Sequence, residues 1–175
     1  MARAGGSLTL ALVGALLGCG ADPGNSLGEL RGALGVHYPE GWRFATVDDD
    51  ARSQLKPGER ADWLGGDFDG DGRSDYAAQV VVQRMGHTSG SDSAQLLVVL
   101  LRRRNRFERH VLGADRGPST AVYLGRIPRG ETLHDYEGRE GITLESDAVH
   151  QTFLGQASVA YVYDDGKWRE ILTGD

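Results

Sequence analysis

The residues of this chain that best suit a chemical role are the closely spaced aspartates of residues 67–75, which read D-F-D-G-D-G-R-S-D. Carboxylates stand at positions 1, 3, 5 and 9 of the segment: Asp67, Asp69, Asp71 and Asp75. Calcium takes about six to eight oxygen ligands, and the odd positions of a tight loop can all face one centre. Arg73 would contribute its backbone carbonyl while its guanidinium points away, and Gly72 permits a sharp reversal with positive φ. The segment therefore predicts a calcium site.

A solvated hairpin turn is the simpler interpretation of the same segment, because Asp and Gly dominate turns. Four like charges so close together repel one another unless a cation lies among them, which favours the metal. A cage of carboxylates closed by its own loop leaves little room for a substrate. We therefore expect the calcium ion to be structural rather than catalytic.

The wider segment, W-L-G-G at residues 63–66 followed by the acidic loop and Tyr76, resembles the calcium loop of FG-GAP and VCBS repeats. These repeats occur in integrin α-chain propellers and in many bacterial surface proteins. The resemblance implies that the aspartates coordinate calcium between two short antiparallel strands. The pattern occurs once here, whereas a propeller needs several copies, so a propeller is not implied. An EF-hand is disfavoured, because Ala78 stands where that loop has a bidentate glutamate and residues 76–83 lack helical periodicity.

The N-terminal region has the pattern of a bacterial export signal. Arg3 gives a positive start, and residues 8–17 form an apolar run that is too short to cross a bilayer as a helix. The following L-L-G-C resembles the lipobox of bacterial lipoproteins, which implies that Cys19 is lipidated and becomes the mature N-terminus. An ordinary secretory signal with a stray cysteine, or a buried cytosolic strand, are the alternatives. In that family an aspartate after the cysteine favours retention at the inner membrane, so the resemblance implies that Gly20 directs the protein to the outer membrane or periplasmic face.

Length and composition predict one globular domain. The 175 residues suffice for a single core, and 39% hydrophobic with 25% charged residues is ordinary for a folded chain. We expect a lipoprotein signal peptide at residues 1–18, a lipidated tether at 19–35, and a single β-rich calcium-binding domain at 36–175. Residues 1–18 contain one basic side chain and no acidic one. The remaining chain has 18 basic and 25 acidic side chains, which gives a formal charge of −7. Such an acidic chain has no general electrostatic reason to bind nucleic acid.

Two short helices are indicated ahead of the strands. Asn25 or Ser26 suits the N-cap of a helix that ends near Gly35, although the same residues also suit a tether. The acidic run at residues 48–50 suits the start of a second helix over residues 51–55, because carboxylates favour the N-terminal end of the helix dipole.

Strand follows strand from residue 61 onward. We expect strands at residues 61–66, 76–83, 94–101, 107–112, 120–127, 131–136, 141–144, 149–154, 157–163 and 167–172, with a loop at 87–93. The nearly continuous apolar run at 94–101 is typical of a strand that is buried on both faces or central in its sheet. The D-D-G at 164–166 predicts a hairpin. The spacing predicts a mainly β (β-rich α+β) fold, with an antiparallel sheet folded as a sandwich or small barrel.

The chain has one basic cluster, formed by Arg102, Arg103, Arg104 and Arg106. It suits contact with a phosphate, a lipopolysaccharide head group or an acidic partner. It equally suits a solvated turn between two hydrophobic strands, where charge prevents edge-to-edge aggregation.

Catalytic patterns are weak in this sequence. The five histidines lack the spacing of a zinc site, no serine stands in G-x-S-x-G, and no glycine-rich phosphate cradle opens a helix. Glu137, Glu140 and Glu145 lie near one another in the sequence, but nothing fixes the separation that a glycosidase pair needs.

We expect an exported, lipid-anchored, non-catalytic binding module of the bacterial cell envelope, with a protein or glycan partner. An inhibitor or immunity-type protein of an envelope enzyme and an envelope hydrolase stay open as alternatives.

Overall fold

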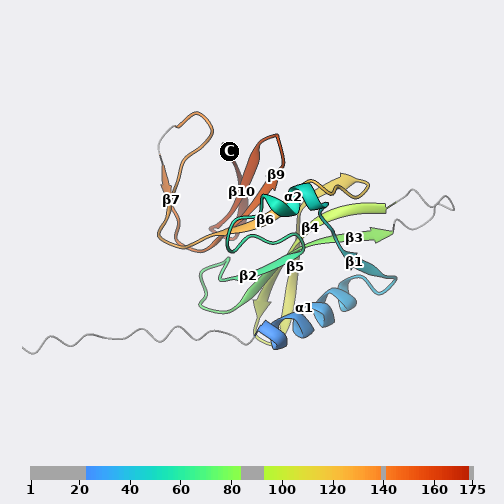
Figure 1. Ribbon diagram of the computed structural model, residues 1–175. Coiled ribbons are helices and arrows are strands. Elements are labelled where there is room, and N and C mark those ends of the chain that lie inside the picture. The colour runs from blue at the N-terminus through green and yellow to red at the C-terminus, as the bar shows by residue number, and fades with distance from the viewer. Residues whose placement is uncertain (1–22, 84–92, 139–140, 174–175) are drawn as a thin grey trace, which may run out of the picture.

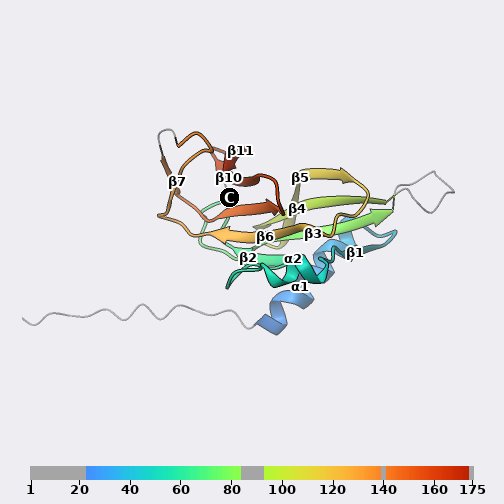
Figure 2. The ribbon, with the colours of Figure 1, turned by 45° about the horizontal axis from the view of Figure 1, so that its top comes forward.

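The computed structural model describes residues 23–83, 93–138 and 141–173, in which two antiparallel sheets face each other and a helix covers the outer face of one of them (Figure 1, Figure 2). The first sheet has the order β1-β3-β4-β5, with β2 also paired to β3. Its strands are β1 (Trp42–Phe44), β2 (Trp63–Gly66), β3 (Asp75–Gln83), β4 (Ser93–Arg103) and β5 (Arg106–Arg116).

The second sheet has the order β11-β10-β9-β6. Its strands are β6 (Val122–Ile127), β9 (Ala148–Phe153), β10 (Ser158–Asp164) and β11 (Lys167–Thr173). A two-stranded ribbon of β7 (Thr132–Leu133) and β8 (Ile142–Thr143) leads into β9. The fold is therefore mainly β, as the sequence predicts. The sheets pack as a sandwich, and the described residues form no closed barrel.

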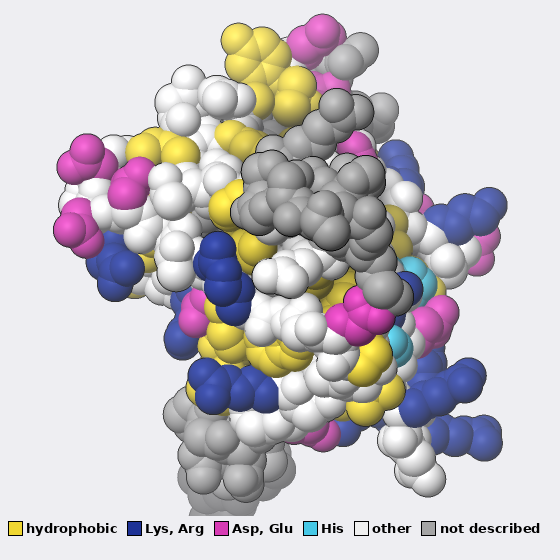
Figure 3. All heavy atoms as spheres, turned by 90° about the vertical axis from the view of Figure 1, so that its right-hand side faces the viewer, with side chains coloured by type: hydrophobic (Ala, Val, Ile, Leu, Met, Phe, Trp, Pro, Cys, Tyr) yellow, Lys and Arg dark blue, Asp and Glu magenta, His cyan; other side chains and the backbone are white. Residues whose placement is uncertain are grey.

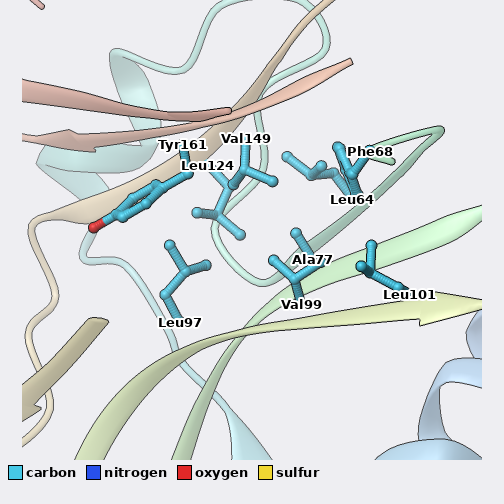
Figure 4. Close-up of a cluster of buried hydrophobic side chains, with 9 residues drawn as sticks. All are labelled: Leu64, Phe68, Ala77, Leu97, Val99, Leu101, Leu124, Val149 and Tyr161. Atoms are coloured by element: carbon cyan, nitrogen blue, oxygen red, sulfur yellow. The ribbon is translucent and has the colours of Figure 1, made fainter. Parts of the chain in front are cut away.

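The main core lies between the two sheets, where the alternation of each strand turns apolar side chains inward. Figure 4 shows side chains of the first sheet on one side and side chains of the second on the other, with Leu64 and Phe68 at one end of the layer. The first sheet contributes Ala77, Leu97, Val99 and Leu101, and the second contributes Leu124, Val149 and Tyr161.

β4 is buried on both faces, as its apolar run predicts. Val99 and Leu101 face the second sheet, whereas Val98 and Leu100 belong to a separate cluster on the opposite face of the first sheet. A strand between two apolar layers needs no polar alternation, which accounts for the continuous run.

Helix α1 (Pro23–His37) covers that opposite face. Leu30 and Leu34, one helical turn apart, are fully buried against a cluster that includes Trp63, Tyr76 and Val98. Of the two interpretations of residues 25–35, a short helix or part of the tether, the structure has the helix. The apolar outer face of the first sheet has to be covered, so the helix that buries Leu30 and Leu34 is part of the folded domain.

Helix α2 (Asp49–Ser53) forms where the acidic run predicts it. Asp48 is its N-cap, and the Asp48 side chain accepts a hydrogen bond of 2.8 Å from the backbone N–H of Ala51. The helix packs beside Val47 and Tyr123 and is separate from the acidic loop.

Several strand boundaries differ from the sequence-based expectations. No strand is expected at residues 42–44, but Trp42 and Phe44 of β1 pair with Val82 and Val80 at the edge of β3. The strands expected at 131–136 and 141–144 are reduced to the two-residue β7 and β8. The hairpin at Asp165 and Gly166 is confirmed, and most of the loop at 87–93 lies outside the described residues.

Among the described residues, no helix is both long enough and apolar enough to span a membrane. The face viewed in Figure 3 carries charged side chains of both signs around exposed hydrophobic side chains.

Candidate metal centre

The acidic loop, residues 67–74, joins β2 to β3. These two strands are antiparallel, and the pairing of Gly66 with Asp75 closes the base of the loop. The strand before the loop ends in glycine for a steric reason. A Cβ on Gly66 would lie 2.7 Å from Cε1 of Phe68, closer than any real side chain allows.

Three carboxylates of the loop converge. Asp67, Asp69 and Asp71 each offer an oxygen, and these oxygens all lie within 4.8 Å of one another. Oxygens bound to one calcium ion at about 2.3–2.6 Å are at most about 5 Å apart, so the three can share a cation. The arrangement is therefore a cluster that can hold a metal ion.

The loop backbone orients these carboxylates. Gly72 N–H donates to Oδ2 of Asp67 (3.1 Å), Asp71 N–H to Oδ1 of Asp69 (3.2 Å), and Arg73 N–H to Oδ1 of Asp71 (2.9 Å). Gly72 has a φ of +81°, the positive value predicted for the reversal. Each aspartate therefore has one oxygen held by the backbone. The other oxygen of Asp67 accepts no hydrogen bond from a described residue, whereas that of Asp69 pairs with Arg103 and that of Asp71 lies 3.9 Å from Nε of Arg73.

Asp67 carries the clearest sign of a missing partner. Its Oδ1 is buried and accepts no hydrogen bond from any described residue. Burial raises the pKa of Asp67, and the negative charges of Asp69, Asp71 and Asp147 raise it further, against the opposing hydrogen bond from Gly72. A buried, unpaired carboxylate oxygen surrounded by like charges is stabilised by a cation.

Asp75 has a different role from the other three and lies outside their cluster. It is fully buried, its Oδ2 accepts from Phe68 N–H (2.9 Å), and its Oδ1 accepts from Arg102 N–H (2.7 Å). Burial, with the charges of Asp69 and Asp71, raises the pKa of Asp75 to about 6 despite these hydrogen bonds. Asp75 therefore ties the loop to the end of β4.

Arg73 keeps its guanidinium near the loop instead of pointing it away. Its Nε lies 3.9 Å from Oδ2 of Asp71, and the side chain is about half exposed. This position weakens the expectation that only the Arg73 carbonyl faces the site, because the charged side chain also contacts one of the carboxylates.

The arginine cluster lies at the tight turn between β4 and β5, next to the acidic loop. Arg103 pairs with Asp69 and donates from Nε to Glu108 (2.9 Å), and the bond with Asp69 raises the pKa of Arg103. Arg102 pairs with Glu29 of α1 (2.5 Å) and lies over the ring of Phe107. Arg102 and Arg103, two of the four arginines predicted to contact an anion or a partner, are therefore engaged in ion pairs within the chain.

Arg104 and Arg106, the other two arginines, are exposed at the turn. Arg104 has a φ of +49°, a backbone conformation that a residue with a Cβ adopts at some cost.

The second sheet also holds the acidic loop, through residues that the sequence did not indicate. Asp147, just before β9, accepts at Oδ2 from Asp67 N–H (3.1 Å) and at Oδ1 from Arg129 N–H (3.0 Å). Ser146 donates to the carbonyl of Phe68 (3.0 Å), and the Phe68 ring is fully buried between the sheets. The only sequence signal for this anchor was an aromatic residue within an acidic loop.

Cys19, the predicted lipidation site, lies outside the described residues. Comparison of the chain with protein-family models, curated proteins and solved structures found no match.

Proposed function

We propose that this protein is an exported, lipid-anchored calcium-binding module of the bacterial cell envelope, in which one structural calcium ion holds the acidic loop. The observation that carries the metal part is the convergence of Asp67, Asp69 and Asp71 around the buried, unpartnered Oδ1 of Asp67. The N-terminal signal pattern and Cys19 support the lipid anchor.

Calcium suits this cluster better than the other common ions. The available side-chain ligands are all carboxylate oxygens, which favours calcium, magnesium or manganese over zinc or copper. Magnesium demands a near-ideal octahedron at about 2.0–2.1 Å, whereas calcium accepts irregular geometry and more ligands. Backbone carbonyls and waters would complete the coordination.

The ion would raise the stability of the fold, because the acidic loop contacts both sheets. Phe68 is part of the core, Asp75 is bonded to the end of β4, and Asp147 reaches the loop from the second sheet. Neutralising the three clustered carboxylates would relieve their mutual repulsion at this junction. Extracellular calcium modules bind at about 10⁻⁴ to 10⁻³ M, which suits an exported protein.

Isothermal titration of the chelated protein with calcium and, separately, with magnesium tests the metal. We expect one calcium site of submillimolar to millimolar affinity, weaker magnesium binding, and loss of the site in Asp67→Asn. Arg52→Gln, a change of the same size in total charge at an exposed position on helix α2, is the matched control. Calcium binding that is unchanged in Asp67→Asn contradicts the proposal.

Metabolic labelling with radioactive palmitate in a Gram-negative host tests the anchor. The label should enter the wild-type protein and be absent from Cys19→Ala. Labelling that persists in Cys19→Ala, or no labelling of either protein, refutes lipidation at this residue without affecting the metal site.

A further inference from the structure

The turn between β4 and β5 borders a hollow with an unusually basic lining. The hollow has a volume of about 550 Å³ and is lined by Arg73 from the acidic loop and by Arg103, Arg104, Asn105 and Arg106 from the turn. No acidic residue of the described chain lines it. Guanidinium groups present planar sets of N–H donors that match phosphate and carboxylate oxygens.

This concentration of positive charge contrasts with the net negative charge of the whole chain. The chain is acidic, with a formal charge of −6, yet four arginines gather around one hollow. Two of them, Arg104 and Arg106, are exposed and form no ion pair with a described residue. A merely solvated turn would not need a further arginine from a separate loop. Arg73 joins the hollow from the acidic loop, so the fold brings two segments together around it.

The ion pair between Arg103 and Asp69 connects this hollow to the acidic loop. Arg103 is also held by Glu108, so two carboxylates compete with any anion for its guanidinium. A calcium ion among Asp67, Asp69 and Asp71 would draw the Asp69 carboxylate to itself. It would leave Arg103 with one carboxylate partner and add two positive charges beside the hollow.

The position of the turn also agrees with a membrane-facing role. Glu29 of α1 pairs with Arg102, so the first half of α1 lies beside the turn. Cys19 precedes the first helical residue, Pro23, by four positions, a stretch of chain that spans at most about 14 Å. An acyl chain on Cys19 would therefore place a bilayer surface near this end of the molecule.

We propose that the hollow at the β4–β5 turn binds phosphate groups of the kind carried by anionic lipid head groups, and that calcium in the acidic loop strengthens this binding by releasing Arg103 from Asp69. The coupling to calcium rests on the proposed metal site, whereas the anion site itself does not. Coupling between two ligands is reciprocal, so phosphate binding must raise calcium affinity by the same factor.

Flotation with lipid vesicles tests the anion site, with the full chain carrying Cys19→Ser so that no acyl chain contributes. Vesicles of phosphatidylcholine alone are compared with vesicles that also contain phosphatidylglycerol, each with calcium or with chelator. Any contribution of the apolar N-terminal run is common to all arms. Glycerol 3-phosphate as a competitor distinguishes a site for a single phosphate from one that requires a lipid surface.

The test variant combines Arg104→Gln with Arg106→Gln, and the matched control combines Arg52→Gln with Arg169→Gln, two exposed arginines elsewhere. Each arginine near an anionic surface contributes about fivefold to binding, so the test variant should bind the anionic vesicles roughly 30-fold more weakly. The control should bind like the parent protein. Equal binding by both variants, or equal binding to neutral and anionic vesicles, overturns the anion site.

Calcium should strengthen binding about fivefold, the contribution of one released arginine near an anionic surface. The Asp67→Asn variant should lose that effect while keeping its binding in chelator. This variant corrects for calcium that bridges protein and lipid without entering the loop. If calcium strengthens binding of Asp67→Asn equally, or has no effect on the parent, the coupling is refuted. If the parent binds calcium but neither the vesicles nor glycerol 3-phosphate, the anion site falls while the proposed metal site stands.

Discussion

Substitution of Phe68 by alanine should weaken both the fold and the proposed calcium site. Phe68 is the one large hydrophobic side chain of the acidic loop, and its ring is fully buried between the sheets. Its backbone N–H donates to Asp75, and its carbonyl accepts from Ser146. The ring therefore fixes the loop at its second residue, between two of the clustered aspartates.

The structure sets the expected magnitudes. Truncation of a fully buried phenylalanine costs about 3–5 kcal/mol of unfolding free energy, because it removes apolar contacts and leaves a cavity. A released loop must be ordered again when the ion binds. Fixing one backbone residue costs about 1–2 kcal/mol, so calcium affinity should fall by roughly 5- to 30-fold.

The control is Leu97→Ala, which truncates a buried side chain of the same core cluster on β4, away from the loop. It should lose about 2–5 kcal/mol of stability and keep the calcium affinity of the parent. Urea unfolding in chelator measures the first quantity, and calorimetric titration with calcium measures the second. Equal calcium affinity in Phe68→Ala and Leu97→Ala would refute the role of the core in shaping the metal site.

Three further predictions concern the rest of the fold. Leu34→Ala should lower the free energy of unfolding in urea by about 2–5 kcal/mol, because it truncates a fully buried side chain. Val36→Ala, at a position that is 79% exposed, should change it by less than about 0.5 kcal/mol. Equal effects would mean that α1 does not belong to the domain. Asp147→Asn should lower the free energy of unfolding in chelator by about 1–3 kcal/mol, because the two side-chain atoms of the amide cannot both accept, from Asp67 N–H and from Arg129 N–H. An unchanged midpoint of urea unfolding would contradict this. Burial lowers the pKa of His150, so this residue binds fewer protons in the folded state than in the unfolded state, and its contribution to stability should fall as pH drops below about 6.5. His150→Gln should therefore lose less stability over this range than the parent protein, and parallel pH profiles would exclude the effect.

Patterns in the sequence predicted those parts of the fold that depend on local chemistry. The continuous apolar run of β4 indicated burial on both faces, and Asp48 indicated the capped start of α2. The D-G pair at Asp165 and Gly166 indicated the final hairpin. In each case, neighbouring residues determine the structure.

Long-range contacts could not be predicted in this way. The sequence left a short helix and a tether open for the segment that forms α1, because Leu30 and Leu34 matter only when the outer face of the first sheet is present. β1 exists because β3 offers an open edge to Trp42 and Phe44.

The same limit applied to the site. The spacing of the aspartates indicated a cation cluster, but not that Asp75 would bond to the end of β4, nor that Asp147 and Arg103 would reach the loop across 80 and 34 residues of chain. Such partners depend on how the two sheets meet, and a local pattern carries no information about that.

The thermal unfolding midpoint with and without calcium tests the central claim most directly. With a dissociation constant of about 10⁻⁴ M, 1 mM calcium would stabilise the fold by roughly 1.4 kcal/mol and raise the midpoint by about 3–6 °C. We predict this rise for the wild-type protein and none for a variant that combines Asp67→Asn with Asp71→Asn. A midpoint that is the same in chelator and in millimolar calcium would contradict the account.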